Sequence, residues 1–240
     1  MSQLNNYRLL TFDVYGTLVD WEGGIVSALS PSLKKANAEG KFTRKEILVA
    51  YETLEKAQQS KTPDMAYSDI LATVHAPLLE KLGLPAPSEE ESKVFGESVG
   101  TWPAFPDTVE ALKKLKQTYK LVVLSNVDRE SFSKTNAGSL QGVEFDLIIT
   151  AQDVGSYKPD QRNFEYMLNA VKEKFGVERE EVLQTAQSQF HDHYPAKKAG
   201  IKSVWIKRAG AAMGNVEEAI YDWKFDTLGE MAEAVGKDSS

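Results

Sequence analysis

The sequence LLTF-DVYGTL, residues 9–18, joins a short apolar run to an aspartate and a glycine turn. The run Leu9–Phe12 does not alternate between apolar and polar residues, as expected of a strand covered on both faces. Asp13 follows at the tip of this strand, and the turn at Gly16 would place its carboxylate beside free backbone N–H groups. For this motif alone, a turn-forming aspartate is the simpler interpretation.

Four further runs of the same kind follow: Leu121–Leu124, Leu147–Ile149, Val182–Leu183 and Val204–Ile206. Apolar residues at helical spacing lie between the runs, over Thr108–Tyr119 and Asn163–Phe175. Strands that alternate with helices predict an α/β fold with a doubly wound, Rossmann-like core of five parallel strands. In such a sheet, ligands bind beyond the carboxyl ends of the strands.

One long interval interrupts this alternation, because more than a hundred residues separate the first strand from the second. A helix is predicted to begin at Thr43, where Glu46 completes a capping box. A second helical stretch is expected over residues 64–82, kinked or split at Pro77, and residues 102–106 form a rigid return. We therefore expect a core domain formed by residues 1–18 and 101–240 and a helical cap domain formed by residues 19–100.

The composition is that of an ordinary globular protein, with 42% hydrophobic and 26% charged residues in a chain of 240. The 28 Lys and Arg against 35 Asp and Glu give a net charge of −7, which disfavours a nucleic-acid partner. The absence of cysteine excludes disulfides, thiolate catalysis and cysteine-based metal sites. No apolar run approaches the roughly 18 residues of a membrane span, and residues 1–6 lack a signal-peptide pattern. We expect a cytoplasmic protein with a small-molecule partner and neither a nucleic-acid nor a membrane partner; a homodimer is left open.

Polar residues also follow the later strands. Ser125 and Asn126 come after the second strand, Lys158 follows the third, and Asp192 follows the fourth. Alone, each has a simpler explanation, such as a helix cap or a solvated lysine. Together they occupy the ends of strands where ligands gather, and this order indicates a site.

These motifs resemble the four motifs of the haloacid dehalogenase superfamily over nearly the whole chain, including a cap inserted after the first motif. The matching residues are Asp13-x-Tyr15-Gly16-Thr17-Leu18, Ser125-Asn126, Lys158-Pro159, and Asp192 followed eight residues later by Gly200. The resemblance implies that Asp13 is a nucleophile that forms a covalent ester or acyl phosphate with the substrate.

Two positions, Tyr15 and Gln187, help to decide whether the chain resembles the phosphatases or the dehalogenases of the superfamily. Its phosphatases need magnesium and a second aspartate two residues after the nucleophile, where this chain has Tyr15, whose phenol is a poor acid. Gln187 replaces an aspartate five residues before Asp192, which removes one charge from the magnesium site. A halide leaves without a proton or a divalent cation, and 2-haloacid dehalogenases carry Asp-x-Tyr-Gly-Thr-Leu. We therefore expect hydrolytic dehalogenation of a 2-haloalkanoic acid without a cofactor; a phosphatase that uses magnesium on a small phosphate ester is the alternative.

By the same resemblance, Asp13 would attack C2 of the substrate and expel halide, and water would then hydrolyse the ester. Thr17 and Ser125 would position the nucleophile or the substrate carboxylate. Lys158 would keep Asp13 ionised, and Asp192 would orient the water or Lys158. Asn126 would line the halide cradle, and the further substrate-binding residues would be Tyr15, Ser188, Trp21 and Tyr51.

The chain departs from the dehalogenase pattern at three places. Dehalogenases carry a halide-facing arginine on a cap helix, whereas we interpret Arg44, in the first turn of its helix, as solvated. Phe164 replaces a tyrosine six residues after the motif lysine, and Gln187-Ser188-Gln189 replace a Ser-Ser-Asn sequence. These departures bear on the substrate more than on the covalent mechanism.

His191 and His193 flank Asp192. Either could be the base that activates water, since imidazole titrates near neutral pH, and equally both could only fix Asp192 by hydrogen bonding. We expect no metal there, because the histidines follow the strand and no cysteine is available. A protein without catalysis that binds a partner or small molecule through its cap is the non-enzyme alternative, and the presence of Asp13 and Lys158 counts against it.

Overall fold

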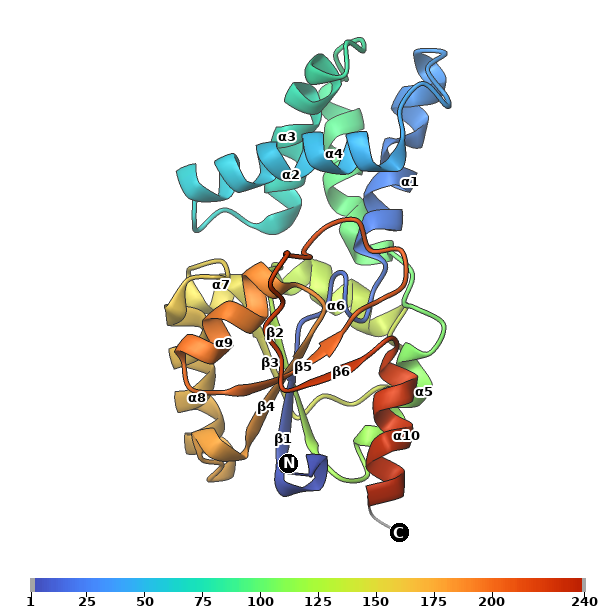
Figure 1. Ribbon diagram of the computed structural model, residues 1–240. Helices are drawn as coiled ribbons and strands as arrows, with labels where there is room; N and C mark the ends of the chain where they lie inside the picture. Colours follow the sequence, from blue (N-terminus) through green and yellow to red (C-terminus); the bar gives the residue numbers. More distant parts are fainter. Residues whose placement is uncertain (1–2, 239–240) are drawn as a thin grey trace.

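The computed structural model describes residues 3–238 and contains a six-stranded parallel sheet in the order β3-β2-β1-β4-β5-β6 (Figure 1). The strands are β1 (Leu9–Phe12), β2 (Lys120–Ser125), β3 (Leu147–Thr150), β4 (Val182–Ala186), β5 (Lys202–Ile206) and β6 (Trp223–Phe225). The predicted α/β fold is confirmed, and the five predicted strands are present. The prediction of five strands misses β6, because this strand has three residues and none of them is fully buried.

Helices cover both faces of the sheet and form a separate group beyond its carboxyl edge (Figure 1). Those beside the sheet are α5 (Thr108–Leu115), α6 (Arg129–Ala137), α7 (Ala151–Val154), α8 (Gln161–Phe175), α9 (Tyr194–Lys198) and α10 (Leu228–Asp238). The group beyond the edge, called the cap below, is α1 (Trp21–Lys35), α2 (Arg44–Lys61), α3 (Tyr67–Lys81) and α4 (Glu89–Glu97). Shorter turns are η1 (Leu4–Asn6), η2 (Ser98–Thr101), η3 (Arg179–Glu181) and a π-helical turn, η4 (Gln189–His193). No helix within residues 3–238 is long and apolar enough to cross a membrane.

Strand β1 lies at the centre of the sheet, where Phe12 is in register with Val123 of β2 and Thr185 of β4. Leu10 and Phe12 belong to the apolar cluster that includes α5 and α10, whereas Leu9 belongs to the cluster formed with α8. Because both faces are covered, the strand is almost entirely apolar. The chain leaves it at residue 13, on the edge where parallel sheets bind ligands.

Two predictions concern the cap helices, a capping box at Thr43 and a kink or break at Pro77. Thr43 accepts a hydrogen bond from the Glu46 N–H (3.2 Å), and Glu46 accepts one from the Thr43 N–H (2.7 Å), so the predicted capping box is confirmed. Pro77 lies inside α3, which is neither split nor ended there. Leu78 and Leu79 are buried on the far side of Pro77, and their burial offsets the missing backbone hydrogen bond. The division into residues 1–18 with 101–240 and residues 19–100 stays a prediction.

Two short segments connect the cap to the sheet side by side. The Asp20 N–H donates to the Pro103 carbonyl (2.8 Å), and Val19 pairs antiparallel with Ala104. Trp102 is buried at the cap end of this connection, and its indole ring packs on the backbone of Gly24 in α1. This close contact is possible only because residue 24 is a glycine, so the position of α1 over the sheet depends on Gly24.

We predict that Gly24→Ala destabilises the protein, because a Cβ at this position would overlap ring carbons of Trp102. Overpacking of this kind costs about 1–3 kcal/mol. A matched control is Gly236→Ala in α10, where no neighbouring atom lies within 4 Å of the added Cβ; there the free energy of unfolding should rise by about 0.5 kcal/mol. Urea denaturation measures both, and equal effects of the two substitutions would contradict the packing described.

Candidate active site

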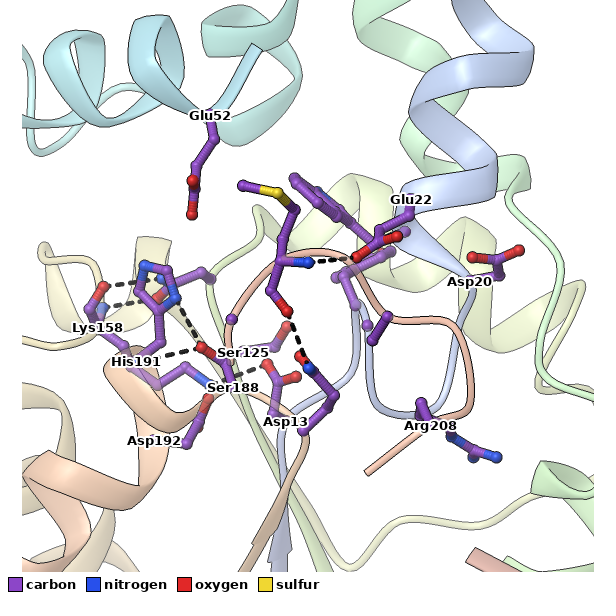
Figure 2. A pocket seen from close by; sticks show the side chains of 18 of the residues that line it. Asp13, Asp20, Glu22, Glu52, Ser125, Lys158, Ser188, His191, Asp192 and Arg208 are labelled. Atoms are coloured by element: carbon purple, nitrogen blue, oxygen red, sulfur yellow. Dashed lines mark hydrogen bonds and ion pairs between the residues drawn. The ribbon is translucent and has the colours of Figure 1, made fainter. Parts of the chain in front are cut away.

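A cavity of about 180 Å³ lies between the cap and the carboxyl edge of the sheet (Figure 2). Its floor comes from the ends of β1, β2 and β4, its roof from α1 and α2, and one wall from the loop after β5. Nine of the sequence-predicted site residues line it: Asp13, Tyr15, Trp21, Ser125, Asn126, Lys158, Ser188, His191 and Asp192. Thr17, Tyr51 and His193 do not line it.

Lys158 is the centre of the floor, and its side chain is almost completely buried. Its Nζ donates to Asp13 Oδ1 (3.0 Å), Asp192 Oδ1 (2.7 Å) and the Leu124 carbonyl (2.8 Å). Burial alone would lower the pKa of Lys158, but the charges of the two carboxylates outweigh it and raise this pKa. The ammonium group is therefore a permanent cation between two carboxylates.

Asp13 is held from its other side by Thr17. The Thr17 hydroxyl donates to Asp13 Oδ2 (2.6 Å) and accepts the backbone N–H of Gln187 (2.9 Å). The buried Thr17 thus orients the carboxylate from below the cavity. Each Asp13 oxygen carries one hydrogen bond in a fixed direction, and each keeps a second lone pair.

Asp192 is fully buried, and its position depends on two residues that sequence reasoning missed. Gln184 of β4 donates from Nε2 to Asp192 Oδ1 (2.9 Å), and Gln184 Oε1 in turn accepts a hydrogen bond from the Thr11 hydroxyl of β1. Burial, opposed by the charge of Lys158, raises the pKa of Asp192. Asp192 Oδ2 has no hydrogen-bond partner among the described residues, so it is available to a substrate or a water. A glutamine inside an otherwise apolar strand is the sequence signal that could have indicated this support.

The two residues after β2 have different surroundings. Asn126 makes two hydrogen bonds to the backbone of Lys158. Its Nδ2 donates to the Lys158 carbonyl (3.0 Å), and its Oδ1 accepts the Lys158 N–H (2.6 Å). It therefore positions Lys158. Its Nδ2 keeps a second N–H and Asn126 lines the cavity, so its place in a halide cradle stays a prediction. Ser125 is 2% exposed, lines the cavity, and its hydroxyl has no partner in the described part of the chain.

The aromatic residues divide between the wall and the packing behind it. The Tyr15 hydroxyl lies 2.8 Å from Thr135 Oγ1, and burial raises the pKa of Tyr15. Trp21 lines the cavity and donates from Nε1 to the Tyr67 hydroxyl (3.0 Å). Tyr51 is fully buried behind this pair, so the expectation that it touches the substrate is not supported.

The two histidines also differ in their placement. His191 lines the cavity, its Nδ1 is 3.0 Å from Ser188 Oγ, and burial lowers its pKa to about 4, so the ring is neutral at pH 7. His193 is buried outside the cavity between Ser203 Oγ (2.8 Å) and the Ala186 carbonyl (3.0 Å). Both ring nitrogens of His193 are occupied, so its predicted role in water activation is not supported.

Charged residues of the cap and of the loop after β5 complete the lining. Arg44 lines the cavity, and its guanidinium is 3.1 Å from Glu22 and 3.6 Å from Asp20. The Arg44 side chain is 49% exposed, which agrees with its interpretation as a solvated arginine, and it also pairs with these two carboxylates of the cavity lining. Arg208, which sequence reasoning missed, is buried against Asp107 (2.6 Å).

Gln187 occupies the position where the phosphatase pattern has a magnesium ligand. Its Nε2 donates to the Met213 carbonyl (3.0 Å) and to Asn215 Oδ1 (3.4 Å), so the side chain ties down the loop after β5. Within residues 3–238, no three carboxylate, histidine or cysteine side chains are grouped as metal ligands. The residues present at this position thus do not fit a magnesium site.

Glu55 is a buried carboxyl group in the roof. It accepts hydrogen bonds from the hydroxyls of Tyr67 (2.6 Å) and Tyr51 (3.3 Å), and burial raises its pKa from 4.5 to about 7. The unfolded chain releases this proton near pH 4.5, whereas the folded protein keeps it until about pH 7. The folded state therefore binds more protons in this window, and the free energy of unfolding falls as pH rises through it.

We predict that Glu55→Gln removes the decrease in the free energy of unfolding that Glu55 causes between pH 4.5 and 7. This decrease amounts to at most roughly 3 kcal/mol. Urea denaturation at pH 4.5 and 7.5 measures it in the wild type and the variant. The exposed Glu97 supplies the control, because Glu97→Gln should keep the wild-type pH dependence. An unchanged pH dependence in Glu55→Gln would contradict the buried, protonated state.

Comparison with known proteins places this site in a family. Residues 10–206 match the model of the haloacid dehalogenase-like hydrolases. An (S)-2-haloacid dehalogenase 4A from Burkholderia cepacia is 27% identical over 218 residues, which cover 86% of either chain. A phosphoserine phosphatase from Thermus thermophilus is 27% identical over 132 residues, covering 55% of this chain and 51% of the phosphatase. The structure of the L-2-haloacid dehalogenase from Xanthobacter autotrophicus superposes with a TM-score of 0.77 at 19% identity, covering 96% of this chain and 98% of that one. The chain belongs to the haloacid dehalogenase-like hydrolase family.

Proposed function

We propose that this hydrolase removes halide from a 2-haloalkanoic acid through a covalent ester on Asp13. A carboxylate oxygen of Asp13 attacks C2, the carbon–halogen bond breaks, and the halide takes the bonding electron pair. The buried ammonium of Lys158 pairs with the Asp13 carboxylate, and the Thr17 hydroxyl limits the rotation of this carboxylate. The relative named (S)-2-haloacid dehalogenase 4A, which matches over 86% of either chain, supports this substrate class.

The surroundings of Tyr15 favour a halide over an alkoxide as the leaving group. The residue two positions after the nucleophile is Tyr15, whose hydroxyl is bonded to Thr135 and whose pKa is raised by burial. Such a phenol is a poor proton donor, so a leaving alkoxide would stay unprotonated from this position. A halide ion is a stable leaving group without a proton, which matches this environment.

Hydrolysis of the ester regenerates Asp13. Water adds to the side-chain carbonyl of Asp13 and loses one proton, the ester bond breaks, and the departing alkoxide takes up this proton and leaves as the 2-hydroxy acid. Asp192 Oδ2, which has no hydrogen-bond partner within residues 3–238, is suited to accept the proton of this water. Lys158 stabilises the negative charge that develops on the Asp13 oxygen. His191 is a second candidate for the same proton, because it is neutral at pH 7 and lines the same cavity.

A phosphatase is the second candidate function, and the phosphoserine phosphatase that matches about half of the chain favours it. Magnesium would supply charge neutralisation of the phosphoryl oxygens in that reaction. Gln187 and Tyr15 do not fit its needs, since a neutral amide supplies less charge to magnesium than an aspartate, and the buried phenol of Tyr15 is a poor proton donor. We therefore derive no step through magnesium. The homodimer and the cytoplasmic location stay predictions.

The test is a panel of (S)-2-chloropropanoate, (S)-2-bromopropanoate and small phosphate esters, assayed for released halide and phosphate with and without a chelator. We expect halide release that survives chelation and is lost, by at least about a thousandfold, in Asp13→Asn. The amide is nearly isosteric with the carboxylate, so circular dichroism of Asp13→Asn should be unchanged. Phosphate release that appears only with added magnesium would move the protein to the phosphatase branch.

A further inference from the structure

The cavity carries an excess of negative charge. Six carboxyl groups line it, those of Asp13, Asp20, Glu22, Glu52, Glu55 and Asp192, against three cationic side chains, those of Arg44, Lys158 and Arg208. Burial keeps Glu55 protonated up to about pH 7, so below that pH it adds no charge, and the ionised carboxylates outnumber the cations by at most five to three. In the part of the chain that the structure describes, each of these cations already has a carboxylate partner. An anionic group that enters the roof therefore finds no unpaired positive charge to bind it.

Two of the cations are shared between pairs of carboxylates. Lys158 lies between Asp13 and Asp192, and Arg44 lies between Asp20 and Glu22. Each group of three keeps one formal negative charge when all its members are ionised. Glu22 is also fixed by the backbone N–H groups of Ala212 (2.8 Å) and Met213 (2.9 Å), so it cannot easily swing away from Arg44.

Glu52 adds a further carboxylate to the roof. Its side chain extends from α2 into the cavity, toward Lys158 and His191 (Figure 2). Its one cationic partner, Lys56 at 3.0 Å, lies outside the cavity lining and is half-exposed, so solvent weakens this pair. Glu52 is therefore the roof carboxylate best placed to meet a charge on a substrate.

Aromatic rings line the same cavity: Tyr15, Trp21, Tyr67 and Phe105. The Phe105 ring already packs against the Arg208 guanidinium, so Tyr15, Trp21 and Tyr67 are the rings open to a ligand. Aromatic faces next to carboxylates are the surroundings in which proteins hold ammonium groups, by cation–π attraction and ion pairing. The floor differs, because the buried hydroxyl of Ser125 has no partner among residues 3–238 and can donate to a substrate carboxylate. Floor and roof thus suit opposite ends of one molecule.

We propose that the natural substrate is zwitterionic: a 2-haloalkanoic acid whose far end carries an ammonium group, held in the roof by Glu52 and the neighbouring aromatic rings. This inference rests on the proposed function for its reacting end, but the roof's preference for a cation is independent of the reaction. Glu52 determines specificity here and takes no part in the bond-breaking steps.

The test uses two isosteric series of 2-chloroalkanoates that end in either a trimethylammonium or a tert-butyl group, with two to four methylenes before the end. The quaternary nitrogen cannot cyclise onto C2, and the tert-butyl group matches its shape without the charge. We expect kcat/KM for chloride release to be at least about tenfold higher for the best ammonium substrate than for its tert-butyl partner. Glu52→Gln should reduce this ratio several-fold, and Glu52→Lys should invert it, whereas the control Glu97→Gln on α4 should leave it unchanged.

Calorimetric binding of the corresponding 2-hydroxy acids to the wild-type protein separates the two proposals. If no chloride is released from any substrate but the ammonium acid still binds more tightly than the tert-butyl acid, the dehalogenation proposal fails and the cation site stands. If chloride is released equally from both series, or if the ratio in Glu52→Gln equals that of the wild type, the cation site is overturned. Equal binding of the two hydroxy acids overturns it as well.

Discussion

The site depends on one buried ion pair network, in which the ammonium of Lys158 is shared by Asp13 and Asp192. Removing these charges from water is costly unless every one of them is paired and hydrogen-bonded. Three elements contribute to that pairing: Asp13 follows β1, the Leu124 carbonyl lies on β2, and Asp192 follows β4. The central strands of the sheet must therefore be in their native register before the network can form.

Further residues restrict how this network can move. Asn126 binds the backbone of Lys158, Gln184 binds Asp192, and Thr17 binds Asp13. Each of the three charged side chains thus has a neutral neighbour that sets its direction. Such preorganisation lowers the cost of orienting a nucleophile when the substrate arrives. The cap contributes a different lining, which contains acidic and aromatic side chains such as Glu22, Glu52 and Trp21.

The core of the fold and most of the floor of the site could be predicted from the sequence, whereas in the roof only Trp21 was. Leu9–Phe12 is apolar because both faces are covered, so its strand and the position of Asp13 follow from local pattern alone. The roof brings together residues distant in sequence, and no periodicity shows that Arg44 would turn toward Glu22. His193 illustrates the limit most clearly: it is adjacent to Asp192 in sequence, yet the π-helical turn directs it to Ser203, outside the cavity. Trp223–Phe225 was missed for a similar reason, since an edge strand of three half-exposed residues has no apolar run.

The most direct measurement of the central claim is a single turnover in water enriched in heavy oxygen, with enzyme in excess over the substrate. If Asp13 is the nucleophile, water attacks its side-chain carbonyl, and mass spectrometry of the peptide that contains Asp13 should find one heavy oxygen in that side chain. The hydroxy acid released in this turnover should be unlabelled. Heavy oxygen in the product of the first turnover, with Asp13 unlabelled, would mean that water attacks the substrate directly and would contradict the account.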